Sequence, residues 1–296
     1  MSKTFCLHTT MLALLLSSLI GSSGSANELR IMSFNLRYGT ANDGENHWDK
    51  RKEFVAETIH AYAPDLLGTQ ETLEFQKEFL SKKMPAYTSV GVGRDRGDQS
   101  GEMTALFFKT ERFELLEEGH FWLSETPRIP GSKSWDTSLT RMCSWVRLQD
   151  RVSESKRPIL FMNTHFDHRG SDARLQSARL LRKKADELGD GCDIVLTGDF
   201  NAAADSEPYR ALFSELPGET VFLDTYATKR PADESGEATF SGFKSSTLEG
   251  SRIDWIAIRG SWTLQEAAID RTGKEGRTPS DHYPVTAILS QANSTR

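Results

Sequence analysis

The sequence contains few cysteines and no long internal apolar run, and these absences exclude several classes of protein. Three cysteines occur in 296 residues, which is too few for a small fold held together by disulfides. No internal stretch approaches the ~20 consecutive apolar residues of a membrane-spanning helix. Linkers, low-complexity tracts and short-period repeats are also absent, so we expect one continuous globular domain and a monomer.

Positive charge is also in short supply. The chain has 36 Lys and Arg against 42 Asp and Glu, a formal net charge of -6. A protein that coats nucleic acid needs an excess of positive charge along its binding surface. Nucleic acid is therefore a substrate that we do not favour, although Arg94, Arg96 and Arg169 could form a short positive rim.

The one noticeable apolar run lies at the extreme N-terminus. Lys3 provides a positive charge, residues 11–20 are mostly apolar, and small residues follow as far as Ala26. This order is typical of a cleaved secretory signal peptide, and an uncleaved anchor is the alternative. We predict a signal peptide at residues 1–26, a domain at residues 27–296, and export to the periplasm or the extracellular space.

Strand-like and helix-like segments alternate along the rest of the chain. Apolar residues at helical spacing predict helices at 49–62, 73–80, 175–188 and 208–213. Between these helices, strands follow one another through short turns. Two mixed sheets packed face to face, each covered by helices on its outer side, satisfy this pattern, so the predicted fold class is an α/β four-layer α/β/β/α sandwich. The predicted strands are 28–35, 65–71, 88–92, 103–109, 113–123, 141–149, 158–166, 193–199, 238–243, 252–258, 262–269 and 284–289.

Polar residues collect where the apolar strands end. The first strand ends in Asn35 and the second in Glu71, while two later apolar runs lead to His165 and Asp199. In an α/β sheet the carboxyl ends of the strands are where ligands bind. We therefore expect these side chains to meet in one site.

The residue types suit phosphoester chemistry. Glu71, Asp199 and Asp281 are hard oxygen ligands that fit Mg²⁺ or Mn²⁺ better than zinc. His165 and His282 can donate to a phosphoryl oxygen if a nearby carboxylate keeps them charged. A carboxylate beside a metal can align and deprotonate a water. Each residue alone has an ordinary structural explanation as a turn, a cap or a buried acid. Only the whole set indicates phosphoester chemistry.

Six short motifs together resemble those of the endonuclease/exonuclease/phosphatase superfamily, which includes deoxyribonuclease I and exonuclease III. The resemblance spans about residues 30–289, and the segments 91–97, 121–124 and 141–145 are similar to a secreted bacterial branch. It implies the deoxyribonuclease I-like form of the sandwich. The motifs are Ser33-Phe34-Asn35, Gln70-Glu71, Thr164-His165, Gly198-Asp199-Phe200-Asn201, Arg252-Ile253-Asp254 and Ser280-Asp281-His282.

The resemblance implies a metal centre and a base. Glu71 would be the principal metal ligand with Asn35 beside it, and Asp281 would support the metal or its water. Asp199 would orient and deprotonate the attacking water. Asn201 would hold a phosphoryl oxygen.

It also implies two histidines with acidic partners. His282 would contact the scissile phosphate, with Asp254 behind it to fix its tautomer and charge. His165 would be the second histidine, oriented by Glu102, and Arg141 would bind the phosphate.

Three functions therefore remain open at this point. The first is an exported Mg²⁺- or Mn²⁺-dependent phosphoesterase that hydrolyses P–O bonds by in-line attack of water, with a small phosphodiester or phosphomonoester as substrate. The second is a nuclease acting on DNA or RNA. The third belongs to another class, a non-catalytic binding module that keeps the fold but has no need of the full residue set.

Overall fold

The computed structural model describes residues 28–215, 221–230 and 236–291, and the statements below concern those ranges. The signal-peptide prediction falls on residues 1–26, outside the described residues. Among the helices within the described ranges, none has the length and apolar character needed to cross a membrane.

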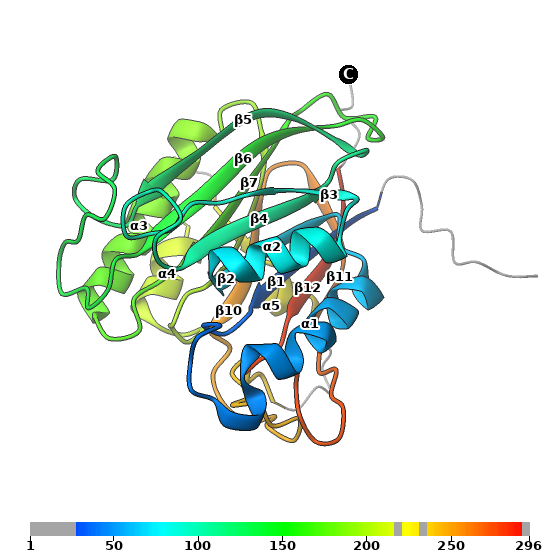
Figure 1. The fold of residues 1–296 in the computed structure, drawn as a ribbon. Helices are drawn as coiled ribbons and strands as arrows, with labels where there is room; N and C mark the ends of the chain where they lie inside the picture. Colours follow the sequence, from blue (N-terminus) through cyan, green and yellow to red (C-terminus); the bar gives the residue numbers. More distant parts are fainter. Residues whose placement is uncertain (1–27, 216–220, 231–235, 292–296) are drawn as a thin grey trace, which may run out of the picture.

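Two mixed sheets of six strands each form the body of the protein (Figure 1). The first consists of β1 (Leu29–Asn35), β2 (Leu66–Thr72), β3 (Tyr87–Val90), β4 (Met103–Lys109), β11 (Trp262–Ile269) and β12 (Val285–Gln291). The second consists of β5 (Phe113–Trp122), β6 (Met142–Asp150), β7 (Ile159–His165), β8 (Asp193–Asp199), β9 (Leu223–Asp224) and β10 (Asp254–Arg259). The strand orders are β11-β12-β1-β2-β4-β3 and β5-β6-β7-β8-β10-β9.

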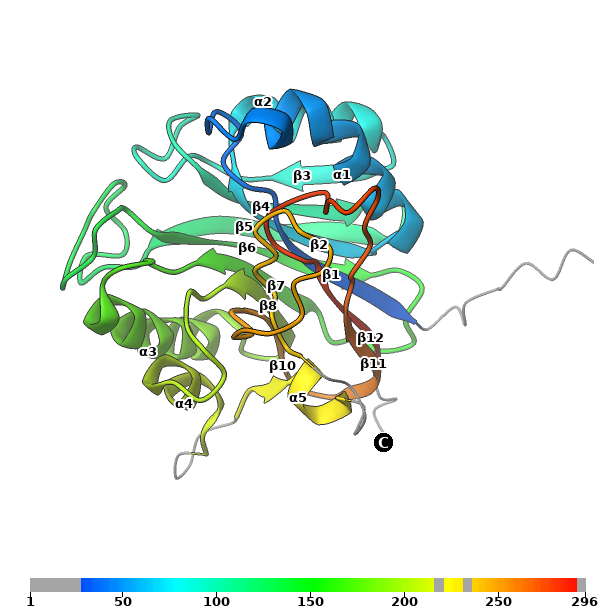
Figure 2. The same ribbon diagram turned by 90° about the horizontal axis from the view of Figure 1, so that it is seen from below.

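Helices cover the outer face of each sheet, which confirms the predicted four-layer sandwich (Figure 2). The first sheet is covered by α1 (Trp48–Tyr62) and α2 (Glu74–Lys83), and the second by α3 (Ser171–Leu188) and α4 (Glu207–Phe213). Two further short helices are η1 (Gly44–Asn46) and α5 (Thr225–Lys229).

An apolar core between the two sheets holds them together. Strands β7 and β8 are buried at every position, as their unalternated apolar runs predict. Ile31 and Leu66 of the first sheet belong to the same buried cluster as Phe161 and Val195 of the second. Burying one such side chain stabilises the fold by about 1.5–3 kcal/mol, so the two sheets are firmly joined beneath the strand ends.

The strand pairing brings the polar strand ends together. Strands β1 and β2 are parallel with Asn35 opposite Gln70, and β7 and β8 are parallel with His165 opposite Asp199. Strand β10 runs antiparallel to β8 and places Asp254 directly opposite Asp199. The carboxyl ends of β1, β2, β7 and β8 therefore carry four of the predicted site residues, Asn35, Glu71, His165 and Asp199.

The same pairing keeps the two described cysteines apart. Cys143 lies opposite Thr164 near the site end of β7, whereas Cys192 directly precedes Asp193, which lies opposite Ile159 at the other end. Five residues of strand separate those two levels, or about 17 Å. Cys143 and Cys192 are both free thiols, as expected from that separation.

The prediction of a strand at 238–243 is wrong. This segment forms turns and a single bridge between Phe240 and His282. Gly242 and Phe243 have φ angles of 57° and 66°, which reverse the chain direction and prevent a ladder. The amides of Ser241 and Gly242 instead donate to the carbonyl of Asp281, at 2.6 and 3.1 Å. Strand β9 and helix α5 are unexpected additions, because elements of two and five residues are too short to show a period.

Candidate active site

A pocket of about 460 Å³ opens at the carboxyl ends of the central strands. A larger hollow of about 670 Å³ lies over α3 and α4 and contains none of the predicted site residues. We therefore take the smaller pocket as the candidate site. It is lined by Arg37, Tyr38, Glu71, Glu102, Leu139, Arg141, His165, His168, Asp199, Asn201, Phe240, Ile253, Asp281 and His282.

Glu71 reaches the pocket through an irregularity in β2. The pairing of β2 with β4 shifts register between Thr69 and Thr72, and Glu71 between them has a left-handed φ of 55°. A non-glycine residue in this conformation is strained and is held there by its surroundings. One of its oxygens accepts the Tyr38 amide at 2.7 Å. The bulge therefore turns a carboxylate toward the pocket.

Asn35 joins the two sheets inside the site. Its Nδ2 donates to Glu71 Oε1 at 3.1 Å and to Asp199 Oδ2 at 2.9 Å. Its Oδ1 accepts the Arg37 amide at 2.9 Å. In this arrangement the side-chain oxygen is turned away from the acids, so Asn35 holds two carboxylates in place, which differs from the predicted role as an oxygen ligand of the metal.

Asp199 is buried at the centre of the pocket. Its Oδ1 accepts the Asn201 amide at 2.9 Å, and Asn201 has a left-handed φ of 46° that turns the chain back over the carboxylate. Burial and the charge of Asp254 raise the pKa of Asp199. A carboxylate with a raised pKa is a better base near neutral pH.

His282 is held between two acids. Its Nδ1 donates to Asp254 Oδ2 at 2.8 Å, and its Nε2 lies 3.8 Å from Asp199 Oδ2. Burial alone would lower the pKa of His282, but the charges of Asp254 and Asp199 outweigh it and raise that pKa well above the ordinary value. The predicted His282–Asp254 pair is present in the structure, and it allows two like charges to lie on opposing residues of β8 and β10.

Asp281 is a third buried acid that lines the pocket. Its Oδ2 lies 3.5 Å from Arg37, which also forms two 2.9 Å bonds with Asp43. Burial raises the pKa of Asp281, and Glu71 raises it further. The charges of Asp281 and Glu71 therefore repel each other, and a bound cation would relieve this repulsion.

The environment of His165 differs from the prediction. Arg141 Nη1 donates to His165 Nδ1 at 2.9 Å, whereas Glu102 Oε2 is 3.9 Å from that nitrogen and forms a 2.6 Å ion pair with Arg94. Arg141 is therefore the closest partner of Nδ1, and Glu102 lies farther from it. Since arginine has no acceptor, the Nδ1 lone pair faces Arg141. Nε2 of His165 lies 3.0 Å from Nδ2 of Asn201 and 3.4 Å from Oδ2 of Asp199, so an amide donor and a carboxylate both face this nitrogen.

His165 is consequently a neutral side chain. Burial lowers the pKa of His165 well below its ordinary value, and the charge of Arg141 lowers it further. A carboxylate partner that raises the pKa is therefore present for His282, whereas burial and Arg141 lower the pKa of His165.

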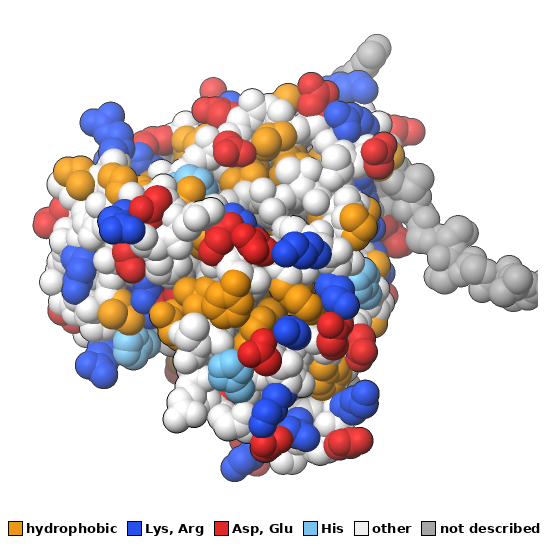
Figure 3. Space-filling model, in the orientation of Figure 1, with side chains coloured by type: hydrophobic (Ala, Val, Ile, Leu, Met, Phe, Trp, Pro, Cys, Tyr) orange, Lys and Arg blue, Asp and Glu red, His pale blue; other side chains and the backbone are white. Residues whose placement is uncertain are grey.

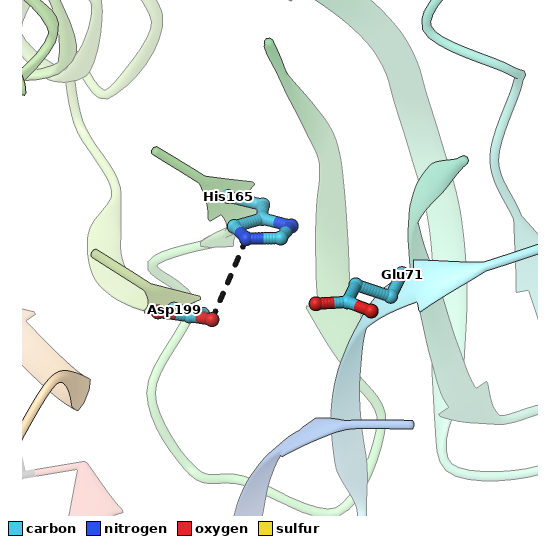
Figure 4. Close-up of side chains that lie close together, drawn as sticks. All are labelled: Glu71, His165 and Asp199. Atoms are coloured by element: carbon cyan, nitrogen blue, oxygen red, sulfur yellow. Dashed lines mark ion pairs between the residues drawn. The ribbon is translucent and has the colours of Figure 1, made fainter. Parts of the chain in front are cut away.

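The oxygen atoms of the site fit a hard divalent cation. In the described part of the chain, ligand atoms of Glu71, His165 and Asp199 lie within 4.8 Å of one another (Figure 4). Those of Asp199, Asp254 and His282 form a second such group. In the second group, the charged His282 already balances the negative charges of Asp199 and Asp254. In the first group, two carboxylates face one another across the pocket, which suits Mg²⁺ or Mn²⁺.

Six pocket residues were not predicted as site residues: Arg37, Tyr38, Leu139, His168, Phe240 and Ile253. Arg37 and Tyr38 follow the first strand in an ordinary-looking loop, His168 lies in a bend, and Phe240 forms an isolated bridge. Phe240 is 51% exposed, and its ring packs edge-on against His282 at 5.3 Å. A possible signal was the position of Arg37 and His168, two or three residues beyond Asn35 and His165.

Comparison with known proteins assigns the chain to a family. The Endonuclease/Exonuclease/phosphatase family profile matches residues 32–282. A solved structure of a family protein from Bacteroides thetaiotaomicron shares 35% identity and a TM-score of 0.82, covering 90% of this chain and 96% of that chain.

Two named relatives are also similar. The mannosyl-6-phosphatase of Bacteroides thetaiotaomicron VPI-5482 shares 36% identity and a TM-score of 0.80, covering 88% of this chain and 99% of that chain. Mouse nocturnin is 24% identical over 297 residues, covering 88% of this chain; the match spans 64% of nocturnin, just under two thirds of its length.

The His282–Asp254 pair predicts a change in pH dependence. Replacing Asp254 with Asn removes a negative charge from Nδ1 and should lower the pKa of His282. If activity requires charged His282, the alkaline limb of the pH–rate profile will move to lower pH in Asp254→Asn. Asp224→Asn is the matched control, because Asp224 is a buried acid that pairs with Arg252 at 2.7 Å. An unchanged alkaline limb in Asp254→Asn would show that the pair does not set the charge of His282.

Proposed function

The chain belongs to the Endonuclease/Exonuclease/phosphatase family, whose members hydrolyse phosphoester bonds, and on that premise we propose that it is an exported, metal-dependent phosphoesterase with a small phosphate ester as substrate. The observation that carries this proposal is the arrangement of Glu71, Asp199 and the charged His282 around one pocket. It places hard oxygen donors and a cationic hydrogen-bond donor side by side, which is what a phosphoryl group requires.

Glu71 is the principal residue that would hold Mg²⁺ or Mn²⁺, with Asp281 on the adjoining rim. When bound, the cation neutralises charge on a phosphoryl oxygen and lowers the pKa of a bound water. Asn35 keeps Glu71 oriented by donating to its Oε1. Arg37 limits the negative charge at this rim, since it lies 3.5 Å from Asp281.

The remaining residues manage protons and orientation. Asp199 takes the proton of the attacking water, and its raised pKa suits that task. His282 donates from Nε2 to a phosphoryl oxygen while Asp254 holds its other nitrogen. Asn201 is positioned beside Asp199 and His165, because its backbone amide donates to Asp199 Oδ1 at 2.9 Å and its Nδ2 lies 3.0 Å from His165 Nε2.

Charge and similarity both favour a small substrate. Two arginines that could have made a positive rim are ion-paired, Arg94 with Glu102 at 2.6 Å and Arg96 with Asp98 at 3.1 Å. Acidic and basic side chains are interspersed on the face shown in Figure 3. The relative named as a mannosyl-6-phosphatase is 36% identical, so a phosphorylated sugar is the substrate class that we favour.

Export rests on the N-terminal pattern alone. Lys3, the apolar residues 11–20 and the small residues up to Ala26 follow the order of a signal peptide. We propose that cleavage after Ala26 releases the domain into the periplasm or the extracellular space.

A non-catalytic role would not require this residue set. Glu71, Asp199, Asn201, Asp281 and His282 are all present and line the same pocket. A binding module that catalyses no reaction does not require a strained Glu71 or a buried, charged histidine.

Metal dependence is the first test of the proposal. Glu71→Gln replaces one carboxylate oxygen by an amide nitrogen, so the affinity for a hard cation should fall and activity on a phosphate monoester should drop by at least about a hundredfold. Glu74→Gln on α2 is the matched control, because Glu74 pairs with Lys77 outside the pocket. Excess EDTA should inhibit the native protein, and Mg²⁺ or Mn²⁺ should restore it. Full activity in EDTA together with full activity of Glu71→Gln would refute the metal mechanism.

Salt dependence separates the small-substrate proposal from a nuclease. Each phosphate contacted on duplex DNA contributes a slope near -0.9 to the log–log dependence of affinity on salt. We expect duplex DNA to be a poor substrate, and KM for a sugar phosphate to rise only gently between low and physiological salt. KM measured against salt on both substrates decides the matter. Efficient cleavage of duplex DNA with a slope of four or more contacts would identify a nuclease.

A further inference from the structure

Arg141 is a buried cation without a close anionic partner. Its side chain is 5% exposed, and its two ion-pair distances, to Glu102 and Asp167, are both 3.8 Å. Within the described ranges its Nε has no hydrogen-bond partner. Its closest contacts are ring nitrogens of two histidines, His165 at 2.9 Å and His168 at 3.3 Å. Arg141 therefore retains donor capacity at the wall of the pocket.

The same arginine fixes the tautomer of His168. Nη2 of Arg141 faces Nδ1 of His168, and because a guanidinium can only donate, that nitrogen carries the lone pair. The ring proton of His168 must then lie on Nε2. His168 is exposed and lines the pocket, so it offers a fixed N–H donor to whatever binds beside it. Partial burial and the charge of Arg141 lower the pKa of His168, consistent with a neutral ring.

The backbone holds His168 in this position. The preceding residue, Asp167, accepts hydrogen bonds from the amides of Leu139, Arg169 and Gly170 at 3.0, 2.9 and 2.7 Å. It also accepts from the hydroxyl of Ser138 at 2.8 Å. The turn is therefore fixed independently of the His168 side chain, which can be replaced without loss of the fold.

This wall lies on the opposite side of His165 from the phosphate-binding residues. His165 contacts Arg141 through Nδ1, and its Nε2 faces Asp199 at 3.4 Å. Asp199 in turn faces His282 Nε2 at 3.8 Å. The family resemblance implies that Arg141 binds the phosphate; with the phosphoryl group beside His282, the Arg141–His168 wall instead faces another part of the substrate.

The charge balance of the wall favours a neutral oxygen acceptor. Two arginines, Arg94 and Arg141, are accompanied by two acids, Glu102 and Asp167, and both histidines are neutral. The cluster therefore sums to no net charge, and it presents N–H donors of Arg141 and His168 to the pocket beside the Glu102 carboxylate. Hydroxyl oxygens accept such hydrogen bonds without bringing a second negative charge into a buried site.

We propose that Arg141 and His168 form a second subsite that binds hydroxyl oxygens of the leaving group, and that His168 is a specificity-determining residue for polyhydroxylated phosphate esters. This inference rests on the proposed function, since it concerns the part of the substrate beyond the scissile phosphate. It distinguishes a sugar phosphate from an ester whose leaving group carries no hydroxyl.

The test compares kcat/KM for mannose 6-phosphate and for phenyl phosphate, which has no hydroxyl on its leaving group. His168→Ala should lower the ratio of the two values by about tenfold, with phenyl phosphate unaffected. His168→Gln keeps an N–H donor and should restore the ratio to within about threefold of the native value. His60→Ala is the matched control, because His60 lies on α1 and contacts Lys83 outside the pocket.

Each other outcome has a separate meaning. Equal losses on both substrates, or no loss in His168→Ala, would overturn the subsite. The native protein could instead show a kcat/KM for glucose 1,6-bisphosphate at least tenfold above that for mannose 6-phosphate. If His168→Ala abolished this difference, the wall would bind an anion, and the hydroxyl assignment would be overturned. Failure of the native protein to hydrolyse either monoester with Mg²⁺ or Mn²⁺ would overturn the proposed function itself.

Discussion

The hydrogen bonds of Asn35 are the contact on which the site depends. Glu71 comes from the first sheet and Asp199 from the second, and the Nδ2 atom of Asn35 donates to both. Beneath it, Asn163 of β7 donates to the Thr69 and Ala105 carbonyls of the first sheet at 2.8 and 3.0 Å. Fully satisfied buried polar contacts of this kind fix one relative position of two packed layers. The distance between the two carboxylates is thus set by the packing of the sheets.

The electrostatics of the pocket follow from that separation. Asp254 and Asp199 are opposed in the strand register, and charged His282 between them offsets their repulsion. On the other side, Arg141 occupies Nδ1 of His165, and Nε2 of His165 lies 3.4 Å from Asp199 Oδ2. Asp199 is therefore surrounded by donors yet buried, and burial keeps its pKa raised. One carboxylate can in this way serve as a base near neutral pH.

The sequence predicted the parts of this arrangement that depend on period and strand order. Unalternated apolar runs such as Ile159–Met162 placed β7 and β8 inside the molecule, and the residues at their ends predicted the site. Contacts between side chains could not be predicted in the same way. The closer approach of Arg141 than of Glu102 to His165, and the turning of the Asn35 oxygen toward Arg37, depend on rotamers. The left-handed turn at 242–243 could not be predicted either, because no pattern of apolar and polar residues distinguishes it from a short strand.

The position of the metal is the most direct test of this account. Crystals soaked with Mn²⁺ would show the ion by its anomalous scattering. The account predicts a peak in the pocket within about 2.3 Å of a Glu71 carboxylate oxygen, with the Asn35 amide nitrogen still donating to Glu71 and Asp199. A peak that Glu71 does not contact, or no peak in the pocket at saturating Mn²⁺, would contradict a metal centre built on Glu71.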